Sequence, residues 1–337
     1  MSNILLITDS NEDYYYKPFV EENEKRGNPV NIYLFYWAEF PKHFSMSVSL
    51  SQHGLVEGYI DVISALTSEK HSLNVADIAV AWYLRPHPMD RELYATLNDE
   101  EFIIHQNESR GALISLFSCL QCLWINRRDK VLALEGNKLY QQQCAIRAGL
   151  ITPQTLISSC GEDILLFQPE DDALLLKMFN PTTRTTEDGK SYFIYAQRVP
   201  KTFLESKKPQ LSNGPLYVQR YVSKKYEHRV TIAGSSVLNC RISSQVSKKT
   251  EVDWRHYDID KTPHEKVLLP NDIESKLLDF MSAVDLRYGA IDLIETPTGE
   301  FVFLEINPAG QWDWVNHLAS LGIPSAVLDM MIGIANK

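Results

Sequence analysis

The segment from Tyr288 to Gly310 constrains the fold most strongly, because it places acidic and amide side chains inside two apolar runs. The runs are separated by Thr-Pro-Thr-Gly at 296–299, a sequence typical of a tight turn. The segment is therefore predicted to be a β-hairpin. In a regular hairpin of this kind, Glu295 faces Glu300 across the two strands.

Alternation along the second strand predicts a cluster of oxygen ligands. If the hairpin is regular, Asp292 faces Phe303, and Asp292, Phe303, Glu305 and Asn307 share one face. Burying carboxylates without a cation is unfavourable, and oxygen ligands without His or Cys favour Mg²⁺, which shares its shell with substrate phosphates. The residues alone leave an alternative open, in which the acids lie at a solvated edge or pair with arginines.

Length and composition set wider limits. A chain of 337 residues suits two or three domains, and its net charge of −10 argues against a nucleic-acid partner. No apolar run approaches the roughly 20 residues that a membrane helix needs, and the N-terminus leads directly into a strand-like run without a signal peptide. An odd count of five cysteines argues against a disulfide framework. We therefore expect a cytoplasmic protein that binds neither nucleic acid nor membranes.

The pattern of elements changes near residue 125. Before it, strands at 4–8, 31–37 and 78–83 alternate with helices at 55–66 and 90–122, which predicts a small parallel α/β domain. After it, runs of strands interrupted by helices predict an α+β region with a subdivision near 215. The predicted helices are 137–148, 271–284 and 324–335, and the predicted strands are 155–158, 174–179, 192–199, 216–222, 228–233 and 236–243. No GxGxxG follows the first strand, so a Rossmann dinucleotide site has no support.

The hairpin sequence Asp-Leu-Ile…Gly-Glu-Phe-Val-Phe-Leu-Glu-Ile-Asn-Pro resembles the metal-binding end of ATP-grasp enzymes. The resemblance implies an ATP-grasp fold with a preceding pre-ATP-grasp α/β domain. The implied domains are 1–125, 126–214 as the central subdomain and 215–337 as the C-terminal subdomain. It also implies ATP as cosubstrate and two magnesium ions on ATP, held by Asp292, Glu305 and Asn307.

Further positions fit the same resemblance. Lys138, at a helix start, is similar to the lysine that contacts the ATP phosphates, and Lys177 is similar to the second nucleotide lysine, although Met178 replaces the usual proline. Each lysine alone leaves an alternative open, in which it is a solvated surface group. The remaining implied nucleotide-binding residues belong to the interdomain strand, whose backbone reads adenine, and to the ribose acid: Gln219, Arg220, Tyr221, Val222 and Glu227.

Within the class, one branch matches further. The motifs resemble the graspetide (microviridin-type) peptide macrocyclases, which crosslink side chains of a ribosomal precursor peptide. The motifs are Trp82-Tyr83-Leu84-Arg85-Pro86, Glu227-His228-Arg229, Asp253-Trp254-Arg255 and Asn307-Pro308-Ala309-Gly310-Gln311-Trp312. The resemblance implies a homodimer that binds the leader and core of the peptide, phosphorylates an Asp or Glu side chain, and forms an ω-ester or ω-amide.

Roles for single residues follow from this resemblance. Arg229 joins the two lysines in stabilising the transferred phosphoryl group, and Arg241 is the candidate for the tetrahedral oxyanion. Asp253 orients or deprotonates the attacking hydroxyl, unless it only pairs with a neighbouring arginine. Glu187 and Asp188 are candidates for docking a basic residue of the leader.

Two other functions stay open on the sequence. One is a different ATP-grasp ligase, which adds glutamate to a protein terminus or joins small amino acids. The other is an ATP-binding regulatory protein without turnover. The presence of all three implied metal ligands argues against the regulatory protein.

Overall fold

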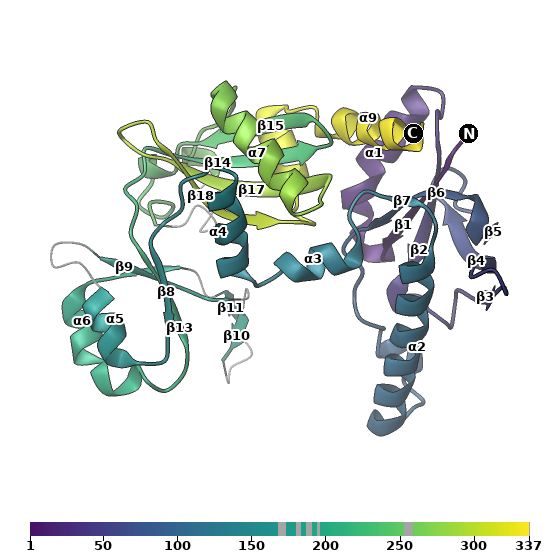
Figure 1. Ribbon diagram of the computed structural model, residues 1–337, viewed down its shortest axis with the longest axis horizontal. Coiled ribbons are helices and arrows are strands. Elements are labelled where there is room, and N and C mark those ends of the chain that lie inside the picture. Colours follow the sequence, from purple (N-terminus) through teal and green to yellow (C-terminus); the bar gives the residue numbers. More distant parts are fainter. Residues whose placement is uncertain (168–172, 180–182, 187–190, 194–195, 253–258, 337) are drawn as a thin grey trace.

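Three larger β-sheets and one two-stranded sheet are present in the described part of the chain, and each larger sheet is built from a successive stretch of the sequence (Figure 1). The computed structural model describes residues 1–167, 173–179, 183–186, 191–193, 196–252 and 259–336. The N-terminal sheet lies at one end of the molecule, and a four-stranded and a five-stranded sheet lie one below the other at the opposite end. Helices and mixed sheets together confirm the predicted α+β class.

The N-terminal sheet has the strand order β3-β4-β2-β1-β6-β7, with β5 paired to β4. Its strands are β1 Asn3–Thr8, β2 Asn31–Tyr36, β3 Met46–Leu50, β4 Val56–Ser64, β5 Lys70–Asn74, β6 Ile78–Tyr83 and β7 Leu123–Trp124. Strands β1, β2, β6 and β7 are parallel, whereas β4 runs antiparallel to β2, β3 and β5. The predicted parallel α/β arrangement therefore holds for the centre of this sheet and not for its β3–β5 edge.

The helix predicted at 55–66 is wrong, because this stretch forms β4. Ile60 and Val62 are fully buried, while Asp61 between them is more exposed. This alternation of buried and exposed side chains is typical of a strand. Gly58 explains why the strand needs glycine: its φ is +131°, and a Cβ there would lie 2.0 Å from the Ser47 carbonyl oxygen. Close backbone approach to β3 therefore decided the local structure.

Two helices cover opposite faces of this sheet. Helix α1 (Asp13–Lys25) packs Phe19 into the cluster that contains Trp82, and helix α2 (Asp99–Cys119) packs Phe117 against Phe35 on the other face. The predicted start of this second helix, residue 90, is too early. Asn98 caps the helix, since its side chain accepts a hydrogen bond from the Glu101 N–H at 2.9 Å.

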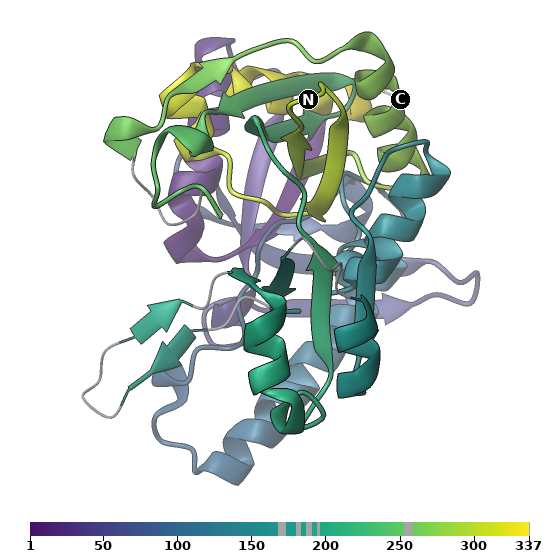
Figure 2. The same ribbon diagram turned by 90° about the vertical axis from the view of Figure 1, so that its left-hand side faces the viewer.

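The four-stranded sheet has the order β12-β9-β13-β8 and is antiparallel at each described pairing. Its strands are β8 Thr155–Ser158, β9 Leu174–Lys177, β12 Gln197–Val199 and β13 Leu216–Arg220, with helices α5 Gly161–Phe167 and α6 Lys201–Ser206 on one face. The strand predicted at 192–199 is divided between β12 and β11 (Ser191–Phe193), which pairs with β10 (Thr183–Thr185). Figure 2 shows the β10–β11 pair projecting from the body.

The five-stranded sheet has the order β16-β15-β14-β17-β18. Its strands are β14 Tyr226–Ala233, β15 Ser236–Ile242, β16 His264–Lys266, β17 Tyr288–Glu295 and β18 Phe301–Asn307. Helices α4 (Lys138–Arg147) and α7 (Asn271–Ala283) contribute to the core on one face of this sheet. Because β13 belongs to the preceding sheet, the division near 215 stays a proposal, as does the one near 125.

The last helix returns to the N-terminal sheet. After α8 (Asp313–Ala319), helix α9 (Ile323–Ala335) packs beside α1, and Val327 and Met331 join the cluster that holds Ile4 and Trp82 (Figure 1). Short helix α3 (Arg128–Leu134) connects the first sheet to α4. Within the described part of the chain, no helix is both long and apolar enough to cross a bilayer.

Candidate active site

The predicted hairpin forms, but its register differs from the regular one. Asp292 of β17 lies opposite Glu305 of β18, Leu293 lies opposite Phe303, and Leu304 is the extra residue of a β-bulge between them. The prediction that Phe303 faces Asp292 is therefore wrong. Likewise, Glu295 pairs with Phe301 and not with Glu300.

The bulge reverses the alternation and separates core from site. Phe303 is fully buried against Phe280 of α7, at a ring-centroid distance of 5.0 Å. Glu305 and Asn307, after the bulge, line a cavity of about 800 Å³ together with Asp292. The three predicted metal ligands thus share one face, as predicted, and the bulge sets Glu305 directly opposite Asp292 and turns Phe303 to the core.

Arg229 of β14 neutralises Asp292. The two residues are paired in the sheet register, and Arg229 Nη1 donates to Asp292 Oδ1 at 3.0 Å and to Oδ2 at 3.1 Å. Burial alone would lower the pKa of the Arg229 guanidinium, but the Asp292 carboxylate holds it above its ordinary value. Arg229 Nη2 also donates to the Gln311 carbonyl at 3.3 Å, which ties this pair to the segment after Asn307.

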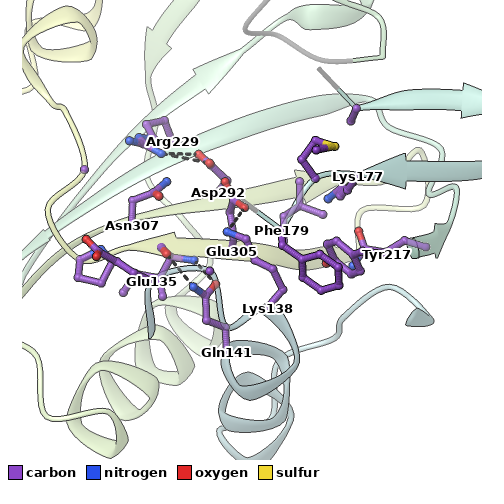
Figure 3. A pocket seen from close by; sticks show the side chains of 18 of the residues that line it. Glu135, Lys138, Gln141, Lys177, Phe179, Tyr217, Arg229, Asp292, Glu305 and Asn307 are labelled. Atoms are coloured by element: carbon purple, nitrogen blue, oxygen red, sulfur yellow. Dashed lines mark hydrogen bonds and ion pairs between the residues drawn. The ribbon is translucent and has the colours of Figure 1, made fainter. Parts of the chain in front are cut away.

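Lys138 neutralises Glu305. It lies in the first turn of α4, and its Nζ is 2.6 Å from Glu305 Oε2 (Figure 3). The side chains are only 12% and 21% exposed. The predicted phosphate lysine therefore lies beside a predicted metal ligand, at the start of a helix whose dipole favours anions.

Gln141 holds α4 against β18, and the sequence reasoning did not identify it. Its Nε2 donates to the Ile306 carbonyl at 3.1 Å, and its Oε1 accepts from the Ile306 N–H at 3.0 Å. The buried amide thus pairs with β18 as another strand would. This contact positions Lys138, one turn earlier on the helix, next to Glu305.

The donor set fits magnesium only if the nucleotide completes it. Among the described residues, no three His, Cys, Asp or Glu side chains form a metal-binding group. Asp292, Glu305 and Asn307 offer two carboxylates and one amide oxygen at the cavity wall. Mg²⁺ commonly binds one or two carboxylates plus phosphate oxygens, so this incomplete set agrees with a metal carried on ATP.

The predicted nucleotide-binding residues line the same cavity. Phe179 stacks on Tyr217 at 5.5 Å between ring centroids, and Tyr217 is paired in register with Lys177. Figure 3 shows Lys177, Phe179 and Tyr217 on one side of Asp292 and Glu305, with Asn307 and Glu135 on the other. Gln219, Arg220, Tyr221 and Val222 also belong to the cavity wall.

Glu227, the predicted ribose acid, is buried at the cavity and has a cationic partner. Lys224 Nζ donates to Glu227 Oε1 at 2.8 Å and to the Val252 carbonyl at 2.9 Å. Lys224 had not been identified from the sequence, because a lysine three residues before an acid is common on protein surfaces. Only the tertiary structure shows that both side chains are buried.

The structure does not bring Arg241 to the cavity. In the register of β14 and β15, Arg241 pairs with His228, so it lies on the sheet face opposite to Arg229 and Asp292. Its guanidinium forms an ion pair with Glu265 and lies over the Tyr226 ring at 4.5 Å. The predicted oxyanion role of Arg241 therefore has no supporting contact. Asp253, Glu187 and Asp188 lie outside the described residues.

Comparison with solved structures identifies the fold. The chain matches the RiPP-associated ATP-grasp ligase of Chryseobacterium gregarium with a TM-score of 0.87 and 26% identity, over 99% of this chain and 97% of that one. It also matches two macrocyclases from Microcystis aeruginosa MRC. For MdnC, the TM-score is 0.81 and the identity 23%, over 98% of this chain and 99% of that one. For MdnB, the TM-score is 0.71 and the identity 22%, over the same two shares.

These likenesses confirm the ATP-grasp fold predicted from the hairpin. They also confirm the predicted resemblance to peptide-modifying ATP-grasp ligases and the enzyme class, a ligase. No protein-family model matches the sequence, and no curated protein matches it significantly. The assignment therefore rests on the tertiary structure and on the site residues described above.

Proposed function

We propose that this enzyme uses ATP to activate Asp or Glu side chains of a ribosomal precursor peptide and joins them to other side chains of the same peptide. The observation that carries the proposal is the cavity that Asp292, Glu305 and Asn307 line together with aromatic and cationic residues of the four-stranded sheet. The likeness over 99% of the chain to a ligase solved with ADP and with a leader and core peptide supports the same substrate class.

The first step transfers the ATP γ-phosphoryl group to a carboxylate oxygen and releases ADP. Lys138 and Arg229 form ion pairs with the predicted metal acids, so they stabilise negative charge on the phosphoryl oxygens and on the acids themselves. Magnesium, when bound with ATP, would be held by Asp292, Glu305 and Asn307 and would neutralise phosphate charge. The stacked Phe179 and Tyr217 provide an apolar wall at the nucleotide end.

In the second step, a hydroxyl or amine of the peptide attacks the acyl phosphate carbon. The new bond is an ω-ester or an ω-amide, phosphate leaves with the bonding pair, and the nucleophile loses one proton. We propose Asp253 for orienting or accepting that proton, and Glu187 and Asp188 for the leader contact. Two magnesium ions, a homodimeric assembly and a cytoplasmic location belong to the same proposal.

The test is incubation of the purified protein with its precursor peptide, ATP and Mg²⁺, followed by mass spectrometry. Crosslinking removes one water per bond, whereas addition of an amino acid raises the mass. Loss of water that depends on ATP supports the proposal. A gain of mass would indicate a different ligase, and binding of ATP with no ADP release in the presence of any peptide would indicate a regulatory protein.

A further inference from the structure

One part of the cavity wall comes from the N-terminal sheet and has no role in the steps above. Strands β1 and β6 are parallel neighbours, and the segments that follow their carboxyl ends carry Glu12, Arg85 and His87. Arg85 and His87 line the cavity that contains the metal acids. Ligands of parallel sheets commonly bind outside the carboxyl ends of the strands.

A buried carboxylate holds both the Arg85 and the His87 side chains. Glu12 is only 3% exposed; its Oε2 accepts from Arg85 Nε at 3.1 Å, and its Oε1 lies 2.9 Å from His87 Nε2. Arg85 also has a backbone φ of +50°, an uncommon value for a residue with a side chain, which precedes Pro86. Such strained conformations are often retained at binding sites.

Arg85 reaches the segment that follows the metal amide. Its Nη1 donates to the Ala309 carbonyl at 3.2 Å, two residues after Asn307. The neighbouring Gly310 carbonyl accepts from Tyr288 OH at 2.9 Å, and the Gln311 carbonyl accepts from Arg229. Arg85 is thus held by the same backbone turn that positions Asn307 and Arg229.

The remaining donors of Arg85 are available to a ligand. Nε and Nη1 are used, and Nη2 has no hydrogen-bond partner within the described ranges, while the side chain stays 30% exposed. Glu135 also lines the cavity, and burial raises the pKa of its carboxyl although the charges of Arg85 and Arg128 oppose this. No ion pair joins Glu135 to Arg85 among these residues.

We propose that Arg85 is the binding residue for the side-chain carboxylate that the enzyme activates, with Glu12 as its positioning residue. This inference rests on the proposed function and names the part of the cavity that takes the acidic side chain of the peptide. A guanidinium matches the geometry of a carboxylate better than an ammonium does, and a fixed one loses less entropy on binding.

The test uses two small probes in the presence of MgADP: N-acetyl-glutamate α-amide, which carries the carboxylate, and N-acetyl-glutamine α-amide, its neutral counterpart. We expect the wild type to bind the glutamate probe about tenfold to hundredfold more tightly than the glutamine probe, as measured by calorimetry or NMR titration. Arg85→Gln should remove this preference, and Arg85→Lys should retain only part of it.

The matched control is Arg91→Gln. Arg91 lies in the same segment between β6 and α2 as Arg85, but it does not line the cavity and pairs with the exposed Asp99. It should keep the full preference. MgADP affinity, measured separately, should be the same in the wild type and in Arg85→Gln. If MgADP binding is weakened by Arg85→Gln, the arginine serves the nucleotide phosphates and the proposal is wrong.

The proposal is also overturned if the wild type does not distinguish the two probes, an outcome that needs no folded variant. If the preference survives in Arg85→Gln, another cation binds the carboxylate. These outcomes differ from failure of the proposed function, which is read from the mass change of the precursor peptide: crosslinking without probe discrimination rejects only the role of Arg85.

Discussion

Removing the carboxylate of Asp292 should destabilise the protein even when no nucleotide is bound. Asp292→Asn leaves the Arg229 guanidinium buried, with a side chain only 7% exposed, opposite a neutral amide. The complementary change, Arg229→Met, leaves a carboxylate of which 13% is exposed. Unfolding of both variants without nucleotide measures the contribution of this ion pair to stability, apart from its proposed catalytic role.

The expected size follows from the geometry. Two unit charges about 4 Å apart attract by about 4 kcal/mol at an effective dielectric constant of about 20. Breaking a buried pair by removing one partner commonly costs about 3–5 kcal/mol, because the other charge stays buried. Asparagine retains one acceptor oxygen for Arg229, so we expect a loss of about 3 kcal/mol for Asp292→Asn.

The assay is urea unfolding followed by tryptophan fluorescence at neutral pH without nucleotide or metal. The double variant Arg229→Met/Asp292→Asn should lose less stability than the sum of the two single variants, because it leaves no unpaired charge. The control is Asp272→Asn, which breaks an exposed pair with Lys276 and should change stability by less than about 0.5 kcal/mol. Additive losses, or single variants as stable as the control, would refute the reasoning.

Three further predictions concern other parts of the molecule. Lys138→Met should weaken MgADP binding at least about tenfold, measured by calorimetry, because it removes a cation from the predicted phosphate site; unchanged affinity would exclude a phosphate contact. Gly310→Ala should cost about 1–3 kcal/mol in urea unfolding and abolish turnover, since its Cβ would lie 2.5 Å from the Ala290 Cβ. Gly333→Ala, with open space around it, is the matched control. Burial raises the pKa of Asp9 from 3.8 to about 6, so the folded state binds its proton more tightly. The stability contributed by Asp9 is present below about pH 4 and lost as the pH rises through 6, and the stability difference between wild type and Asp9→Asn should fall by about 3 kcal/mol over that range. A difference that grows with pH would show that the two backbone N–H groups bound to Asp9 outweigh its burial.

The element pattern was predictable wherever local signals agreed with burial. The turn at 296–299 lies where the sequence placed it, and the helix predicted at 137–148 forms as α4, Lys138–Arg147. The stretch at 55–66 was not predictable, because its apolar residues fit both the 3.6-residue period of a helix and the two-residue period of a strand. Antiparallel pairing with β3 decided it, at a point where only glycine allows the two backbones to approach.

The site shows the same division. The sequence alone predicted Asp292, Glu305 and Asn307 as a set of hard oxygen ligands, because acids within apolar strands need a partner. It also left open that the acids pair with arginines, as Asp292 does with Arg229. It could not reveal which partners they have. Lys138 reaches Glu305 across 167 positions of the chain, and Arg229 reaches Asp292 across 63.

Only the tertiary structure decided the register of the hairpin. A bulge at Leu304 changes which side chains face the core: Phe303 packs against Phe280 of α7, and Glu305 and Asn307 line the cavity. The acids, the amide and the turn can thus be recognised from the sequence, since they express local chemistry. Their convergence with Lys138, Arg229 and Arg85 is long-range packing, which no local pattern encodes.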